Sequence, residues 1–190
     1  MRITVLILVV FTLTLSGCGP RYMVAKDPCP DVRGVVAPAG KSALVIGRTT
    51  IFGGGVNIEN YVDKKFVGAT KGHSFFVTPV EPGLHYVTAR AENFDTVLLN
   101  FEPDKTYYLQ NEIRMGVFFA RTKYDFVDAQ HLSNDMDGKC NYYEVEGASP
   151  GAALTDDEFK RIVEDYKTDK GGQPINQVTT YQVTNLPEKK

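Results

Sequence analysis

The stretch SFFVTPVEPGLHYVTARAE, residues 74–92, decides the fold class of this chain. Two runs of β-branched and aromatic residues flank Glu-Pro-Gly at 81–83, a composition typical of strands joined by a turn. Within the second run, Val87 and Ala89 alternate with polar neighbours, which is the period of two of a half-buried strand. We therefore expect two strands here.

Similar short runs continue on both sides of this stretch and are separated by turn residues. Strands at such regular spacing are typical of an antiparallel sandwich or barrel. We therefore predict a mostly β protein, a single antiparallel β-sandwich of about seven or eight short strands over residues 42–127. The further runs that carry this prediction are residues 43–48, 56–62, 66–70, 96–101, 106–113 and 117–127.

The chain beyond residue 127 changes character. Residues 128–154 are expected as a turn-rich extension, in which 141–145 is compatible with a strand. Residues 155–170 are predicted as a short amphipathic helix, since Thr155 and Glu158 form a capping box before an apolar stripe. The helix docks on the sandwich or, alternatively, on a partner protein. Residues 171–190 are expected to be a flexible tail with at most one loose strand.

The N-terminal segment has the pattern of a processing signal. Residues 3–15 are uncharged and follow Arg2. As a helix they would span about 20 Å, short of the roughly 30 Å hydrocarbon core, so a signal-peptide apolar region fits better than a membrane span. Leu15-Ser16-Gly17-Cys18 then resembles the lipobox of bacterial lipoproteins. This resemblance implies that the Cys18 sulfur carries diacylglycerol and that the chain is cut before it.

Several expectations follow from this lipoprotein resemblance. Residues 1–17 are the lipoprotein signal peptide, and 18–41 are the lipidated cysteine and a Pro-rich tether. Gly19, where Asp would signal inner-membrane retention, implies an outer-membrane location facing the periplasm. The alternative is an ordinary signal peptide with an incidental cysteine. In an oxidising compartment Cys29 and Cys140 are candidates for a disulfide, with an exposed free Cys29 as the alternative.

Composition limits the classes of partner. The chain has 21 Lys and Arg against 23 Asp and Glu, a formal net charge of −2, and no basic stripe. Nucleic-acid binding therefore has no electrostatic basis, and none is predicted. The expected partners are the membrane, through the lipid anchor, and another envelope protein or peptidoglycan, with binding of a small ligand as the alternative.

Three motifs carry candidate chemistry, each weaker than its structural alternative. Gly residues 53–55 lead into a predicted strand rather than a helix, so a turn is expected, not a phosphate loop. His73, His85 and His131 lack neighbouring ligands at metal-binding spacing, so ordinary histidines are expected. A nucleophilic pair of Cys140 with a histidine has no supporting motif. We predict no enzyme, no cofactor and no catalytic residue.

A calcium loop is the more specific of the minor alternatives. Residues 133–144 place oxygen ligands Asp135 and Asp137, then Glu144, at loop positions 3, 5 and 12 of the calcium-binding template. Ser133 replaces the acidic residue wanted at position 1, and residues 147 and 150 would break an exiting helix. An Asp-Gly turn is the alternative.

Three motifs, the first two of them hairpins, resemble those of small bacterial lipoprotein β-domains of unknown function, PEGA-like or transthyretin-like in style. They are YVDKKFVGAT at 61–70, VEPGLHYVTA at 80–89 and FEPDKTYYLQ at 101–110. Lys64 and Asp104 stand where that family has glycine, so both turns are expected to differ in geometry. The resemblance implies a fold and a location but no catalytic residue. We expect a non-catalytic binding or scaffold module, with a binding surface drawn from the aromatic residues Tyr107, Tyr108, Phe118 and Phe119 or an open strand edge.

Overall fold

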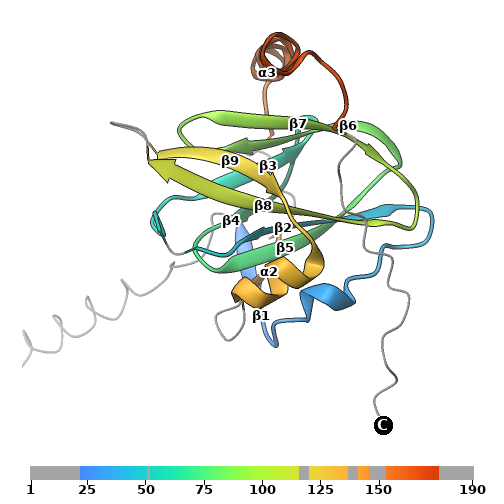
Figure 1. Ribbon diagram of the computed structural model, residues 1–190, viewed down its shortest axis with the longest axis vertical. Coiled ribbons are helices and arrows are strands. Elements are labelled where there is room, and N and C mark those ends of the chain that lie inside the picture. Colours follow the sequence, from blue (N-terminus) through green and yellow to red (C-terminus); the bar gives the residue numbers. More distant parts are fainter. Residues whose placement is uncertain (1–21, 51, 116–119, 137–140, 146–152, 176–190) are drawn as a thin grey trace, which may run out of the picture.

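The computed structural model describes residues 22–50, 52–115, 120–136, 141–145 and 153–175 (Figure 1). Within these residues it is mostly β, with ten strands in two sheets. The strands are β1 (Met23–Lys26), β2 (Ser42–Arg48), β3 (Ile58–Val62), β4 (Lys65–Thr70), β5 (Ser74–Val80), β6 (Gly83–Arg90), β7 (Phe94–Phe101), β8 (Thr106–Met115), β9 (Ala120–Phe126) and β10 (Asn141–Val145). The helices are the 3₁₀ helix η1 (Val32–Gly34), α2 (Ala129–Met136) and α3 (Asp156–Lys170).

The two sheets differ in strand order and in direction of pairing. One has six strands in the order β1-β10-β5-β2-β8-β9, and the other has four in the order β4-β3-β6-β7. β2 pairs in parallel with β8, and β10 pairs in parallel with β5. The six-stranded sheet is therefore mixed, whereas the sequence predicted antiparallel pairing throughout. The long connection between β2 and β8, which contains the whole four-stranded sheet, makes the parallel pairing sterically accessible.

The larger hydrophobic cluster takes its side chains from both sheets. Leu44 and Ile46 of β2 and Val87 and Ala89 of β6 belong to it, and each is at most 1% exposed. Val45, which lies between Leu44 and Ile46 in β2, belongs to a second cluster on the other face of the six-stranded sheet. β2 is buried on both faces, which explains its continuous apolar sequence.

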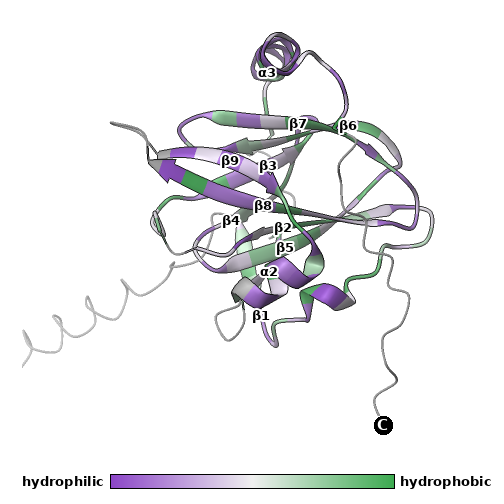
Figure 2. Ribbon diagram, viewed as in Figure 1, coloured by the Kyte–Doolittle hydropathy of each residue, from purple (hydrophilic) through white to green (hydrophobic). Residues whose placement is uncertain are grey.

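The helices cover the outer faces of the sheets (Figure 1). α3 lies above β6 and β7, and α2 lies below β2 and β5 in the view. α2 approaches so closely that a Cβ on Gly47 would stand 2.6 Å from a methyl carbon of Leu132. Figure 2 shows α3 as mostly hydrophilic, since only one side of it meets the sheet; Ile162 and Tyr166 are buried there.

Two segments differ from the sequence prediction. Residues 23–41, expected as part of a tether over 18–41, belong to the fold, because β1 pairs with β10 and Val32 of η1 is 3% exposed. α2 forms within residues 128–154, expected as a turn-rich extension. The predicted C-terminal helix is present as α3, with Thr155 as its N-cap. The expected leader over 1–17 and the tail from residue 176 onward lie outside the described residues.

Candidate functional site

The cysteines and calcium candidates are only partly within the described residues. Cys29 is disulfide-bonded. Cys18 and Cys140 lie outside the described residues, so lipidation of Cys18 and pairing of Cys29 with Cys140 stay predictions. The antiparallel register of β1 with β10 sets Lys26 opposite Tyr142, which brings the segments that carry Cys29 and Cys140 toward each other.

Of the three calcium candidates, the structure describes the side chain of Glu144 alone. The backbone of Asp135 belongs to the end of α2, and Asp137 is outside the described residues. Glu144 lies in β10, where its carboxylate pairs with Lys26 Nζ at 3.4 Å. In the described part of the chain, no three His, Cys, Asp or Glu side chains lie close enough to hold a metal ion. Calcium binding stays a prediction that a calorimetric titration tests.

The histidines take three different positions. His85 of β6 lies with Nδ1 2.8 Å from a carboxylate oxygen of Asp63, in the turn after β3. Asp63 also accepts a hydrogen bond from the Tyr86 backbone, so the pair fixes the turn. The His73 carbonyl accepts the backbone N–H of Asn141 at the start of β10. His131 belongs to α2.

Two of the four aromatic residues predicted for a binding surface are buried. Tyr107 is 2% exposed and Tyr108 is 1% exposed, because both faces of β8 are covered. The Tyr108 hydroxyl donates to the carbonyl of Val32 in η1. Phe118 and Phe119 lie outside the described residues. The suggestion that Tyr107 and Tyr108 bind a partner is therefore wrong.

The glycine turn at 52–55 is held by a buried cation. Arg48, at the end of β2, is fully buried and donates to the carbonyls of Phe52 at 2.6 Å and Val56 at 2.9 Å. Burial lowers the pKa of this guanidinium. The turn thus closes around Arg48, in keeping with a structural rather than a phosphate-binding role.

A polar cluster on the four-stranded sheet joins that sheet to α3. Glu59 of β3 accepts hydrogen bonds from Arg90 of β6 at 2.6 Å and from the Tyr61 hydroxyl at 2.7 Å. The Arg90 guanidinium lies 5.2 Å from the Tyr61 ring centroid and 3.6 Å from Glu158 of α3. Burial raises the pKa of Tyr61 well above its usual value, and the Glu59 carboxylate raises it further. These groups satisfy one another, as a structural network does.

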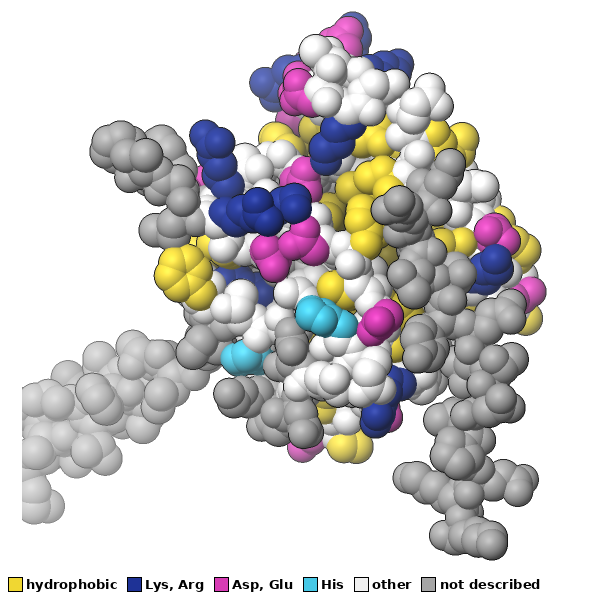
Figure 3. All heavy atoms as spheres, viewed as in Figure 1, with side chains coloured by type: hydrophobic (Ala, Val, Ile, Leu, Met, Phe, Trp, Pro, Cys, Tyr) yellow, Lys and Arg dark blue, Asp and Glu magenta, His cyan; other side chains and the backbone are white. Residues whose placement is uncertain are grey.

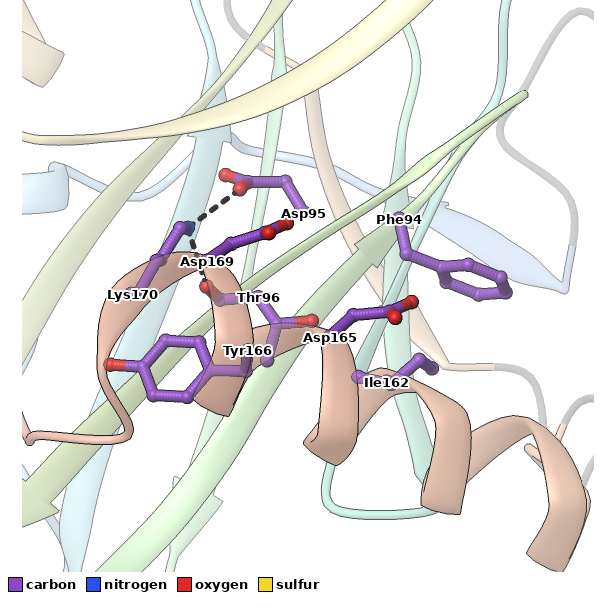
Figure 4. Close-up of a pocket in the computed structure, with 8 residues that line it drawn as sticks. All are labelled: Phe94, Asp95, Thr96, Ile162, Asp165, Tyr166, Asp169 and Lys170. Carbon is purple, nitrogen blue, oxygen red and sulfur yellow. Dashed lines mark hydrogen bonds and ion pairs between the residues drawn. The ribbon is translucent and has the colours of Figure 1, made fainter.

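A pocket lies between α3 and β7 (Figure 4). Its volume is about 140 Å³, enough for one side chain or a few water molecules and well below that of most small-molecule sites. Carboxylates of Asp95, Asp165 and Asp169 border the same gap. Its full lining is Phe94, Asp95 and Thr96 from β7, and Ile162, Asp165, Tyr166, Asp169 and Lys170 from α3.

The three carboxylates of this pocket differ in their surroundings. Asp95 is mostly buried and pairs with Lys170 Nζ at 2.9 Å, while its other oxygen accepts the backbone N–H of Tyr124 in β9. Asp165 and Asp169 are exposed and lie one turn apart near the C-terminal end of α3. Like charges at this spacing, at the negative end of a helix dipole, weaken the helix slightly. Chemically, the pocket offers an acidic rim beside Phe94, which is 40% exposed.

The sequence prediction missed this pocket. Its signal was present in the helix, since Asp165 and Asp169 follow the apolar stripe of Ile162 and Tyr166 at helical spacing. What the sequence did not show is which strand the stripe covers. On the face drawn in Figure 3, basic and acidic side chains are interspersed, and hydrophobic atoms reach the surface just below α3.

The fold and site define a mostly β chain with two sheets and a helix docked on one of them. No family model matches it. A relative from Haemophilus influenzae, described as an uncharacterized protein, is 27% identical over 108 residues, which are 56% of this chain and 64% of the relative. The matched part is thus less than two thirds of that relative's length. No helix of the described residues is both long and apolar enough to cross a membrane.

Proposed function

We propose that this chain is a bacterial envelope lipoprotein, anchored through acylated Cys18, whose β-domain is a non-catalytic binding module. One observation carries the proposal: Cys18 stands between a short apolar segment and a folded domain that begins at Met23. A signal peptide explains the apolar segment before Cys18, and a lipid anchor at Cys18 is consistent with a folded domain that begins five residues later. Gly19 supports an outer-membrane site that faces the periplasm.

The finer fold that we propose is a β-sandwich of the uncharacterised lipoprotein type. The shared hydrophobic cluster supports packing of the two sheets against each other. The first of the three motifs that resemble the family lies on a hairpin, β3–β4. The second and third do not form hairpins, because they join strands of different sheets, β5 to β6 and β7 to β8. Asp104, where the family has glycine, takes a left-handed conformation with φ of 60°, which aspartate tolerates better than most residues. The family turn is thus compatible with this sequence.

Metabolic labelling tests the anchor. Cells that express the chain are grown with a radiolabelled fatty acid, and membranes are separated from soluble protein. We expect label in the wild type and none in Cys18→Ser, which has no thiol to form the thioether. Ser16→Ala keeps a small residue before the cysteine and should label normally. Equal labelling of wild type and Cys18→Ser would contradict the proposal.

The pocket between α3 and β7 is where we propose that the module meets a partner, through a basic side chain of another envelope protein. Its acidic rim and the exposed ring of Phe94 support this choice. A photo-crosslinking amino acid at Phe94 should capture a defined partner in intact cells. The same residue at Phe52, which is 56% exposed in the glycine turn, is the matched control.

The charge of the pocket provides the second arm of this experiment. In an Asp165→Asn, Asp169→Asn background the product formed at position 94 should disappear, because the basic group loses its counter-charges. Recovery of the monomer alone from position 94, or an adduct that survives the double substitution, would contradict a basic partner at this pocket.

A further inference from the structure

The chain between the proposed anchor and the domain is short. Met23, the first residue of β1, is five residues after Cys18. Five residues span at most about 18 Å when fully extended. A domain of this size is roughly 40 Å across. An acylated Cys18 therefore holds the start of β1 close to the bilayer, and the domain has no room to stand away from it.

The edge nearest to the anchor carries exposed apolar side chains. Tyr22, Val24 and Val145 are 37%, 39% and 37% exposed, and they are three of the seven large hydrophobic side chains exposed among the described residues. Met23 pairs with Val145, so the start of β1 and the end of β10 lie side by side. The three side chains thus lie at one end of the β1–β10 pair, with Val145 on the same face of the sheet as Met23 and Val24 on the opposite face.

Two further features suit this edge to a lipid surface. The Tyr22 ring packs edge-on against Phe66 of β4, with ring centroids 5.7 Å apart, so this aromatic group is held in place. Tyrosine favours the interface between lipid headgroups and hydrocarbon. Lys26 and Glu144 pair with each other, so these two charges cancel at this edge. A weak apolar contact suffices, because the anchor keeps the edge at high effective concentration near the membrane.

We propose that the β1–β10 edge, with Tyr22, Val24 and Val145, rests on the lipid surface of the membrane that anchors Cys18. This rests on the proposed function. The contact fixes the orientation of the domain. β1 and β9 are the opposite edges of the six-stranded sheet, five strand spacings or roughly 24 Å apart. Asp95 of the α3–β7 pocket binds β9, so that pocket is turned away from the membrane and toward the periplasm.

Depth-dependent quenching tests this orientation. The full-length acylated protein is reconstituted into vesicles of phosphatidylethanolamine and phosphatidylglycerol that contain a headgroup nitroxide lipid. An environment-sensitive fluorescent amino acid is placed at Val24 or, as the control, at Phe94, which is equally exposed but beside β9. We expect quenching several-fold stronger at position 24 and a blue-shifted emission there only. Equal quenching at both positions would overturn the proposal.

Failure of the orientation and failure of the anchor give different results. Mass spectrometry and vesicle flotation first establish whether the protein is acylated and bound. If the acylated protein floats with the vesicles but the two probes are quenched equally, the anchor is supported and the contact of the β1–β10 edge with lipid is refuted. A protein without acyl chains overturns both.

Two further variants separate lipid from protein as the occupant of this edge. Val145→Ser should reduce quenching at position 24 several-fold, while Phe52→Ser should not change it. If a second copy covered the edge, the position-24 probe would be shielded from nitroxide lipid, and crosslinks between copies would form at Val24. That outcome would overturn the lipid contact.

Discussion

At the scale of single residues, two polar side chains near the start of β7 bind the backbone of β9, the edge strand of the six-stranded sheet. Asn93, just before β7, accepts the backbone N–H of Thr122 and donates to its carbonyl, as a neighbouring strand would. Two residues further along β9, the backbone N–H of Tyr124 donates to the Asp95 carboxylate. The same carboxylate pairs with Lys170 of α3. One carboxylate therefore joins β7, β9 and α3. Its loss should affect all three.

Asp95→Ala should lower the free energy of unfolding by about 1–3 kcal/mol, since it leaves the buried backbone N–H of Tyr124 without its acceptor and removes one of the two acceptors of Lys170. Urea unfolding followed by far-UV circular dichroism measures this change. Asp165→Ala in the same pocket is the control and should shift the free energy by less than about 0.5 kcal/mol. Similar losses in both variants would refute the structural role of Asp95.

Buried phenols give the protein a predictable response to alkali. Burial, reinforced by the charge of Asp31, raises the pKa of Tyr108 to about 12, and burial raises the pKa of Tyr61 and Tyr124 above the usual value as well. Each phenol is neutral in the fold and ionises more readily when unfolded. The stabilisation from Tyr108 is complete below about pH 10 and is lost as the pH rises through about 12, and that from Tyr61 and Tyr124 also declines as the pH rises above about 10.

Absorbance of phenolate during a base titration checks this response. The buried phenols Tyr61, Tyr108 and Tyr124 should ionise late in the titration and only together with the loss of the far-UV signal. A single smooth titration near pH 10 with an unchanged far-UV signal would show that these phenols are accessible in the fold.

At the scale of elements, the sequence predicted those whose pattern is local. The strands β2 to β9 have β-branched runs between turn residues, and α3 has its capping box and apolar stripe. β1 has only four residues and forms because β10, far along the chain, pairs with it. α2 has a local pattern that the sequence prediction missed, since Asp128 accepts the N–H of His131 as an N-cap does and Ala129, Leu132 and Met136 form a short apolar stripe. Leu132 of this stripe packs on Gly47. Neither depends on local sequence alone.

The N-cap of α3 makes a measurable contribution. The Thr155 hydroxyl accepts the backbone N–H of Glu158, and the Glu158 carboxylate accepts the N–H of Thr155 in return. Thr155→Ala should therefore cost about 1 kcal/mol of unfolding free energy, measured in urea. Thr168→Ala, on the exposed side of the same helix, should be neutral or slightly stabilising because alanine favours helix. A neutral Thr155→Ala would mean that packing on the sheet alone holds α3.

The bridge at Cys29 should stabilise the β1–β10 edge. If its partner is Cys140, it closes a loop of roughly 110 residues, and its removal by Cys29→Ser should cost about 2–5 kcal/mol. Peptide mapping without reductant identifies the pairing. A linkage of Cys29 to any other residue would contradict the prediction and would free Cys140.

At the scale of the whole molecule, the candidate binding pocket was beyond prediction because it exists only once α3 docks on β7. Its residues come from segments about 70 positions apart, and sequence spacing does not report that contact. The predicted leader is the reverse case, since its pattern is entirely local. The two proposals combine: with an anchor at the β1 edge and a pocket at the opposite edge, the domain would face outward from the membrane.

The intact mass of the protein extracted from membranes tests this account most directly. We predict a polypeptide that begins at Cys18, with the mass of a diacylglycerol thioether and an acylated amine added. A chain that retains Met1, or one that begins at Cys18 with a free thiol, would contradict it.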